Sequence, residues 1–308
     1  MNPNLSIFEQ AGRLIPDDLE NNSVKEVFKS TGLDWEVIQK PIMYKDSQFH
    51  IKALPQFVGN FRSDNGQFLG IVHPTEYKVV QNIDAFDFID ELTDFTFEKV
   101  GMFDGGRKVF IVGKTSEKIY IDGNTDPIDF YFTFLHGHDG KSSIKFLLCP
   151  IRMFCMNQMN LMLETAVFKH MIRHTGDVQF KLAQIHQAVE DCHLYINELE
   201  SLVQSMINNK PTKTIDQLVI DLIPIENDDS KLVTLRKEEA RSSIKHLYEN
   251  KDDLQNYKGT VYGMVSAVSD YVSHAMPKRM TNYALDNQFI KNLEGNDLIE
   301  RTRLILEN

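Results

Sequence analysis

The chain has 308 residues, of which 42% are hydrophobic and 25% are charged, so it has the length and composition of a globular protein with a substantial core. Its formal net charge is −11, and residues 1–100 hold 9 basic against 16 acidic side chains. A duplex-binding domain needs a basic face to neutralise phosphates, so this acidic balance argues against a dedicated double-stranded DNA binder. An acidic net charge is still compatible with a narrow basic groove.

The sequence has no feature of a membrane or secreted protein. No segment approaches the roughly 20 consecutive apolar residues that a membrane-spanning helix needs. The first residues, Met1 to Leu5, form neither a basic nor a long apolar leader. Cys149, Cys155 and Cys192 are an odd set without the spacing of a zinc site. We therefore expect a cytoplasmic protein with reduced cysteines and no membrane contact.

Extended segments alternate with glycine-containing turns in the first part of the chain. Three β-hairpins are predicted: 57–62 with 67–72 around Ser63-Asp64-Asn65-Gly66, a second at Asp104-Gly105-Gly106 with 107–113 as its returning strand, and a third from 130–134 through Asp139-Gly140 into 143–148. The strands are rich in Phe, Ile and Val, as half-buried sheet surfaces require. Residues 83–92 between the first two hairpins have helical spacing.

From about Asn157 the apolar spacing becomes helical. An apolar stripe from Phe180 to Met206 predicts a long helix over 178–208, which Pro211 ends. Further helices are predicted at 214–223, 231–250, 260–275 and 289–306, with Ser230 as an N-cap. The predicted fold is α+β: an antiparallel, β-rich N-terminal half (1–175) packed with a helical C-terminal half (176–308), two regions that could form one unit.

A series of short motifs follows in a fixed order along the chain. They are Gly32-Leu33-Asp34-Trp35-Glu36-Val37, Asp64-Asn65-Gly66, Leu69-Gly70, Tyr77-Lys78-Val79-Val80-Gln81-Asn82, His138-Asp139-Gly140, Pro150-Ile151-Arg152-Met153-Phe154-Cys155-Met156-Asn157, Ile172-Arg173-His174-Thr175, and Ala267-Val268 with Tyr271 to His274. Together these motifs resemble the phage/plasmid-like family known as domain of unknown function 932, over about residues 30–275.

The resemblance implies carriage by phages or plasmids, often among early or DNA-processing genes, and hence a location in the host-cell cytoplasm. It implies no established activity. Three positions depart from the family pattern: His136 and Ser266 stand where the family has asparagine, and Ser273 stands where it has aspartate. If those polar groups form a site in the family, this chain has altered it.

Two groups of residues could hold a metal. His136, His138 and Asp139 offer two imidazoles and a carboxylate, which suit zinc or manganese, but Gly137 and Gly140 favour an ordinary turn.

His170 and His174 are four apart on a predicted helix and would share a face, as in a zinc protease helix. The glutamate of that motif is absent, so peptidase chemistry is excluded. His174 before Gly176 is better explained as a residue at a helix C-terminus. No metal or other cofactor is therefore expected.

Arg152, Cys155 and Asn157 are predicted where the third hairpin gives way to helix. Arg152 could hold a phosphate beside a helix that begins at Asn157, or it could pair with a carboxylate while Asn157 only caps the helix. Cys155 lies between Phe154 and Met156, which favours burial over a nucleophilic role. Elsewhere, Asp122, Asp126 and Asp129 are predicted to lie in a solvated loop.

Basic and aromatic residues interleave in the β-rich half, as in proteins that bind single-stranded nucleic acid. The same alternation places aromatic rings in a core and cations in water without any ligand. The residues predicted to contact nucleic acid are Tyr77, Arg107, Lys108, Phe110, Lys141, Lys145, Arg152 and Asn157, with phosphates on the cations and bases stacked on Tyr77 or Phe110.

The favoured hypothesis is a non-enzymatic accessory protein that binds single-stranded nucleic acid in recombination or replication as a homo-oligomer. One alternative is a protein-binding inhibitor of a host anti-phage defence system, whose acidic body could mimic nucleic acid. A second is a metal-dependent enzyme built on the histidine groups. No catalytic residue is assigned, because no phosphate-binding glycine loop or nucleophile motif is present.

Overall fold

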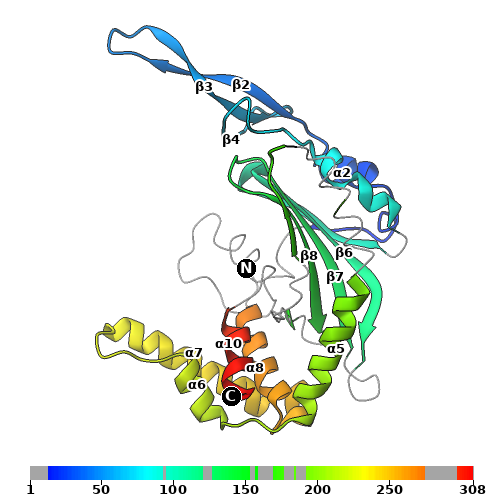
Figure 1. Ribbon diagram of the computed structural model, residues 1–308, viewed down its shortest axis with the longest axis vertical. Helices are drawn as coiled ribbons and strands as arrows, with labels where there is room; N and C mark the ends of the chain where they lie inside the picture. The colour runs from blue at the N-terminus through cyan, green and yellow to red at the C-terminus, as the bar shows by residue number, and fades with distance from the viewer. Residues whose placement is uncertain are drawn as a thin grey trace.

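The computed structural model describes residues 13–92, 95–120, 127–152, 157–158, 169–176, 184, 192–274 and 297–307. Its elements form an elongated molecule (Figure 1). A small sheet lies at one end, a larger sheet in the middle, and helices at the other end. None of the described helices is long and apolar enough to cross a membrane.

The small sheet is antiparallel and has the order β2-β3-β4. Its strands are β2 (Val37–Lys45), β3 (Ile51–Arg62) and β4 (Phe68–Val72). The turn between β3 and β4 needs a left-handed residue, and Gly66 supplies it with a φ of 73°. The first predicted hairpin is confirmed. The long β2–β3 hairpin was not predicted, because its polar and apolar residues do not alternate regularly.

The larger sheet has the order β1-β5-β6-β7-β8-β10 among the described residues, with β9 paired to β8, and all its pairings are antiparallel. Its strands are β1 (Arg13–Leu14), β5 (Thr96–Phe103), β6 (Lys108–Ile119), β7 (Ile128–Gly137), β8 (Ile144–Arg152), β9 (Asn157–Gln158) and β10 (Lys169–Ile172). The second and third predicted hairpins are confirmed as β5–β6 and β7–β8.

Two local predictions in this region are wrong. Asn157 does not begin a helix but pairs with Arg152 between β9 and β8. His170 lies in strand β10, where it pairs with Phe146, so His170 and His174 do not share a helix face. The apolar residues of these short segments follow neither a helical nor a strand period. Such segments adopt the structure of a neighbouring strand, and here β9 and β10 both form hydrogen bonds with β8.

The core of the β-rich half lies on one face of the larger sheet. Every residue of β7 is buried. Phe134 packs on Phe146 (ring centroids 4.9 Å apart) and on Phe86 (6.5 Å), and Phe86 contacts Phe28 (5.7 Å). Phe86 and Phe28 belong to the helices α3 (Asn82–Phe86) and α2 (Val24–Thr31). The predicted helix at 83–92 is confirmed as α3 followed by the 3-10 helix η1 (Asp87–Glu91).

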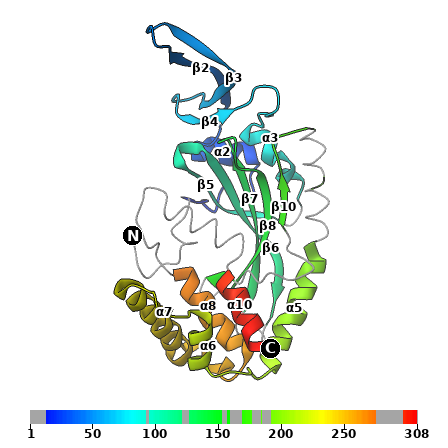
Figure 2. The same cartoon turned by 60° about the vertical axis from the view of Figure 1, so that its left-hand side comes forward.

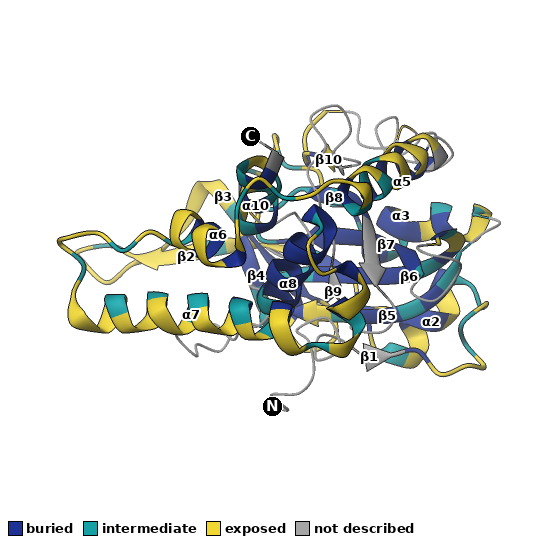
Figure 3. Ribbon diagram, turned by 90° about the horizontal axis from the view of Figure 1, so that it is seen from below, coloured by how far each residue is buried: buried dark blue, intermediate teal, exposed yellow. Residues whose placement is uncertain are grey.

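The helical half packs around one buried helix. Its elements are α5 (Cys192–Asn208), α6 (Ile215–Leu222), α7 (Lys231–Asn250), the 3-10 helix η3 (Asp252–Tyr257), α8 (Val261–His274) and α10 (Asp297–Glu307). Helix α8 contacts α5, α7 and α10, and Figure 3 shows it buried among them. The Ser230 hydroxyl accepts from the Val233 amide, which confirms this N-cap.

The predicted helices are confirmed where the structure describes them, while residues 178–183, 185–191 and 289–296 lie outside the described residues. The buried apolar residues of both halves join in one continuous cluster, which runs from Ile15 to Leu306. The chain is therefore an α+β protein with antiparallel sheets in its N-terminal half and helices in its C-terminal half, as predicted.

The Gly70→Ala substitution should destabilise the contact between the two sheets. A methyl group at this position of β4 would lie 2.5 Å from the carbonyl oxygen of Asp139, which no side chain tolerates without a backbone shift. We expect the free energy of unfolding to fall by about 1–3 kcal/mol, measured by urea denaturation. The control is Ile71→Ala, since the neighbouring Ile71 side chain is 52% exposed. If the two variants are equally stable, the close contact between Gly70 and Asp139 does not stabilise the junction of the two sheets.

Candidate functional site: a histidine cluster and a lysine face

The two sheets meet at a buried polar junction. The Asn60 side chain of β3 is fully buried, and its amide nitrogen donates to the carbonyl oxygen of His138 at 2.9 Å. The turn that follows His138 lies against β4, because Gly70 and Gly140 leave no side chain between the two backbones. Residues that are 78 positions apart in the sequence are thus fixed to each other by one hydrogen bond.

His138 is held by a second asparagine. Its Nε2 lies 2.8 Å from the Asn82 side-chain oxygen, and the Asn82 amide nitrogen donates to the carbonyl of Leu33 at 3.0 Å. Because the Asn82 oxygen is then the acceptor, His138 Nε2 carries the hydrogen. Burial, together with the neighbouring His174, lowers the pKa of His138 to about 3. The imidazole is therefore neutral at physiological pH.

Two further histidines complete a cluster of His136, His138 and His174. The rings of His136 and His138 have centroids 4.2 Å apart, and His136 stacks on His174 at 5.2 Å. His136 Nε2 lies 3.0 Å from the carbonyl of Val80, and His174 Nδ1 lies 3.1 Å from the carbonyl of Lys78. Burial lowers the pKa of both rings, so this histidine cluster is uncharged.

The histidine cluster collects the motifs of the resemblance in one place. Segments 77–82, 138–140 and 172–175, together with Gly70, meet here although they are distant in sequence. Trp35 of the first motif lies against His138, with ring centroids 5.3 Å apart. Sequence reasoning treated these motifs separately, since nothing in their spacing indicates that they pair.

The histidine cluster does not form a metal centre. Its rings are at most 4% exposed, and no three His, Cys, Asp or Glu side chains among the described residues could hold a metal ion together. The Asp139 carboxylate instead accepts from the Lys141 amide at 2.8 Å and from the Ser142 amide at 2.6 Å. This is the turn chemistry that Asp139-Gly140 indicated.

The two aromatic residues predicted to stack bases differ in exposure, since Tyr77 is partly exposed and Phe110 is buried. Tyr77 stacks on His174, with centroids 4.8 Å apart, and its hydroxyl donates to the carbonyl of Gly137 at 3.4 Å. Phe110 is 0% exposed and stacks on Phe103 at 4.7 Å. Phe110 therefore has no ring face open to a base, because strand alternation turns it into the interior. Tyr77 is partly exposed with one ring face against His174, and its stacking role stays a prediction.

The predicted cations do not form a single strip. Arg107 pairs with Asp104 at 3.1 Å. Lys141 is exposed in the turn between β7 and β8, whereas Lys145 lies near the start of β8. Arg152 ends that strand, seven residue steps from Lys145, or about 23 Å. Of the predicted set, Lys108 and Lys145 share one face of the larger sheet, and Arg107 and Lys141 lie at the same end of it.

That face carries more lysines than the prediction contained. Residues that pair directly in an antiparallel sheet point to the same side, and Lys108, Phe110, Val112 and Lys114 alternate along β6. The register places five described lysines on this side, named the lysine face: Lys99, Lys108, Lys114, Lys118 and Lys145. The apolar side chains between them are buried, while all of the lysines except Lys99 are partly exposed.

Asp129 is the carboxylate that the register places among these lysines. It is fully buried in β7, and its oxygens lie 2.8 Å from Lys114 Nζ and 3.1 Å from Lys118 Nζ. The prediction that Asp129 belongs to a solvated loop is wrong, and Asp122 and Asp126 lie outside the described residues. Glu98 is also close, since its charge helps burial to raise the pKa of Tyr131. Asp139 is near Lys108, whose charge helps to lower its pKa, so the five lysines lie with three carboxylates in a chain of net charge −11.

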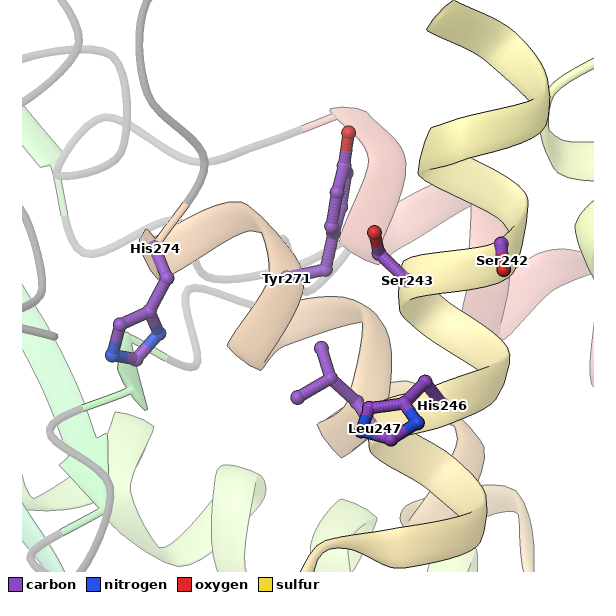
Figure 4. A pocket seen from close by; sticks show the side chains of 6 residues that line it. All are labelled: Ser242, Ser243, His246, Leu247, Tyr271 and His274. Carbon is purple, nitrogen blue, oxygen red and sulfur yellow. The ribbon is translucent and has the colours of Figure 1, made fainter. Parts of the chain in front are cut away.

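A separate cleft of about 530 Å³ lies between α7 and α8. It is lined by Ser242, Ser243, His246, Leu247, Tyr271 and His274 (Figure 4). The two imidazoles lie on opposite sides of the opening, and neither faces Ser243. His274 instead pairs with the buried Asp270 at 3.0 Å, which raises its pKa, and Lys251 pairs with the same carboxylate at 2.6 Å. Among the described residues that line this cleft, no nucleophile contacts a base.

Lowering the pH should weaken the fold through the histidine cluster. Histidines in the unfolded chain take up protons below about pH 6.5, while the buried rings do not, so stability is complete above that pH and falls as the pH drops toward 3. Between about pH 6.5 and 5, each such histidine should lower the free energy of unfolding by up to about 1.4 kcal/mol per pH unit. Urea denaturation at several pH values measures this slope.

The matched variants are His138→Gln and His50→Gln. Glutamine at 138 keeps a donor for Asn82 but cannot titrate, so the slope should become smaller. His50 is an exposed residue of the β2–β3 turn, and its replacement should leave the slope unchanged. A His138→Gln variant with the original slope would show that the buried ring does not control the pH dependence.

Comparison with known proteins assigns the chain to one family. No curated protein and no solved structure matches it. The model of the family described as Domain of unknown function (DUF932) matches residues 69–293, which include the histidine cluster, the lysine face and the buried helix α8. Because the match covers well over half of the chain, the protein belongs to the DUF932 family.

Proposed function

We propose that this protein is a non-enzymatic accessory protein, carried by a phage or plasmid, that binds single-stranded nucleic acid as an oligomer during recombination or replication. The observation that supports the proposal is the lysine face. Five lysines share one side of an antiparallel sheet, near three carboxylates, although acidic residues outnumber basic ones by 44 to 33 in the whole chain. Such a concentration of cations against the overall charge favours an anionic ligand.

The shape of the lysine face suits a single strand better than a duplex. Lys108 and Lys118 are ten residue steps apart on β6, or about 30 Å, which matches a stretch of several nucleotides. The four partly exposed lysines reach solvent from stems that lie along a buried apolar surface. Their phosphate contacts would release counterions, so binding would depend strongly on salt.

The proposal needs an exposed stacking residue in place of the buried Phe110, in addition to the partly exposed Tyr77. Tyr120 follows directly after β6 and is 49% exposed, beside the Lys118 end of the lysine face. An exposed ring next to cations is the arrangement that single-strand binders use for bases. Asp129 would limit affinity, because a phosphate must compete with it for Lys114 and Lys118.

Charge reversal on the lysine face should weaken binding of a labelled oligothymidine. For Lys108→Glu with Lys145→Glu, we expect affinity at low salt to fall at least about tenfold, and the salt dependence, expressed as log K against log salt, to become shallower by about 1.4. Fluorescence anisotropy over a salt series measures both. The control is Lys25→Glu with Lys210→Glu, which changes the net charge equally at two exposed positions away from this face.

The wild-type protein provides the decisive result. If it binds no oligonucleotide at low ionic strength, the proposal is wrong. If the double variant and its control lose affinity equally, binding depends on net charge and the lysine face is not the site.

A further inference from the structure

The β2–β3 hairpin projects from the molecule as an apolar arm. Residues 40–57, named the arm, form its outer part, and Figure 1 shows them extending beyond the rest of the small sheet. Phe49 at the tip is 79% exposed and Ile51 is 66% exposed. The other large apolar residues of the arm that are exposed are Met43, Tyr44, Leu54 and Phe57.

A second apolar surface lies at the opposite end of the molecule. It is formed by residues 220–235, the C-terminal part of α6, the following loop and the first turn of α7, and is named the α6–α7 end. Ile220, Leu232 and Leu235 are 54%, 57% and 51% exposed, and Val233 is 38% exposed. Figures 1 and 2 show this region far from the arm along the long axis.

These two surfaces hold most of the exposed apolar side chains. Of the sixteen large hydrophobic residues that are exposed in the described chain, six lie on the arm and four on the α6–α7 end. Apolar residues gathered in this way are unfavourable in water and mark interaction surfaces, whereas scattered ones are ordinary. Because they lie far apart, the arm and the α6–α7 end of one copy cannot cover each other.

The two surfaces are complementary in charge. In the arm, Lys52 pairs with Asp46 at 2.9 Å and Lys40 lies over the Phe61 ring at 5.6 Å, while Lys45 is exposed. In the α6–α7 end, Asp221 and Asp229 pair with Lys213 and Lys237. Glu226 and Asp228 have no ion pair among the described residues. The α6–α7 end also contains Lys231, so it has four carboxylates and one lysine, against three lysines and one carboxylate in the arm, beside apolar groups on both.

We propose that the arm of one copy docks on the α6–α7 end of a second copy, in a head-to-tail contact. This inference specifies the oligomer that the proposed function includes, but its interface lies outside the lysine face. Every copy offers one arm and one α6–α7 end, so a head-to-tail contact repeats from copy to copy and generates a ring or a filament.

Two single variants test the contact through the molar mass in solution, measured by light scattering without nucleic acid. Phe49→Asp removes the arm surface and Leu235→Asp removes the opposite one. Each variant alone should be monomeric, since every contact needs both surfaces. An equimolar mixture should form a dimer, because the intact arm of the Leu235→Asp chain meets the intact α6–α7 end of the Phe49→Asp chain. A twofold contact between like surfaces would not give this complementation.

Charge variants and a matched control sharpen the test. Lys45→Glu should weaken assembly, and adding Asp228→Lys to it should restore assembly. Leu194→Asp is the control, since Leu194 is 59% exposed on α5 outside both surfaces. Its mass should equal that of the wild type.

Three results would overturn the inference: a wild-type protein that stays monomeric at every attainable concentration, a mixture that forms no dimer, or a Phe49→Asp variant that keeps its mass but loses oligonucleotide binding. The last result would make the arm a nucleic-acid contact. Oligonucleotide binding by monomeric variants would leave the proposed function standing, while assembly without any such binding would refute that function alone.

Discussion

The contact of Asn60 and Asn82 with His138 is the constraint on which the arrangement of the two sheets depends. The first asparagine holds the backbone of the β7–β8 turn and the second holds the imidazole, and all three residues are buried. Apolar packing alone would let the small sheet slide over the larger one, whereas buried hydrogen bonds have one satisfied geometry. The absence of a side chain at Gly70 then lets the backbones touch. The direction in which the arm points follows from this junction.

Local chemistry in the sequence was enough to predict most of the elements. The Gly66 turn, the Gly105 turn and the Ser230 cap each require a particular residue, and each was recognised correctly. Strands β9 and β10 were not, because their hydrogen bonds come from β8, which is distant in sequence. The histidine cluster was likewise not predicted, because it depends on contacts between segments that are distant in sequence. The family motifs were recognised in the sequence. Their meeting at His136, His138 and His174 depends on tertiary contacts, which the spacing of the motifs does not indicate.

Strand alternation explains where the predicted binding residues lie. A basic-aromatic pattern on a strand has two interpretations, and register decides between them residue by residue. Phe110 lies in the interior, while Lys108 and Lys145 lie on one face with lysines that the prediction did not include. Asp129 shows the same effect in reverse: an apparent loop carboxylate became the buried partner of Lys114 and Lys118. It stabilises two cations that would otherwise repel each other at the edge of a core.

The two proposals reinforce each other physically. The lysine face lies in the middle of the elongated molecule, whereas the arm and the α6–α7 end lie at its extremes, so assembly would not cover the proposed binding surface (Figure 2). A head-to-tail assembly would repeat that surface from copy to copy, and a long strand could bind several copies at once. Each later contact is then intramolecular, so moderate affinity per face would give high overall affinity. The acidic character of the rest of the chain would meanwhile disfavour nonspecific binding elsewhere on the molecule, which concentrates the strand on the lysines.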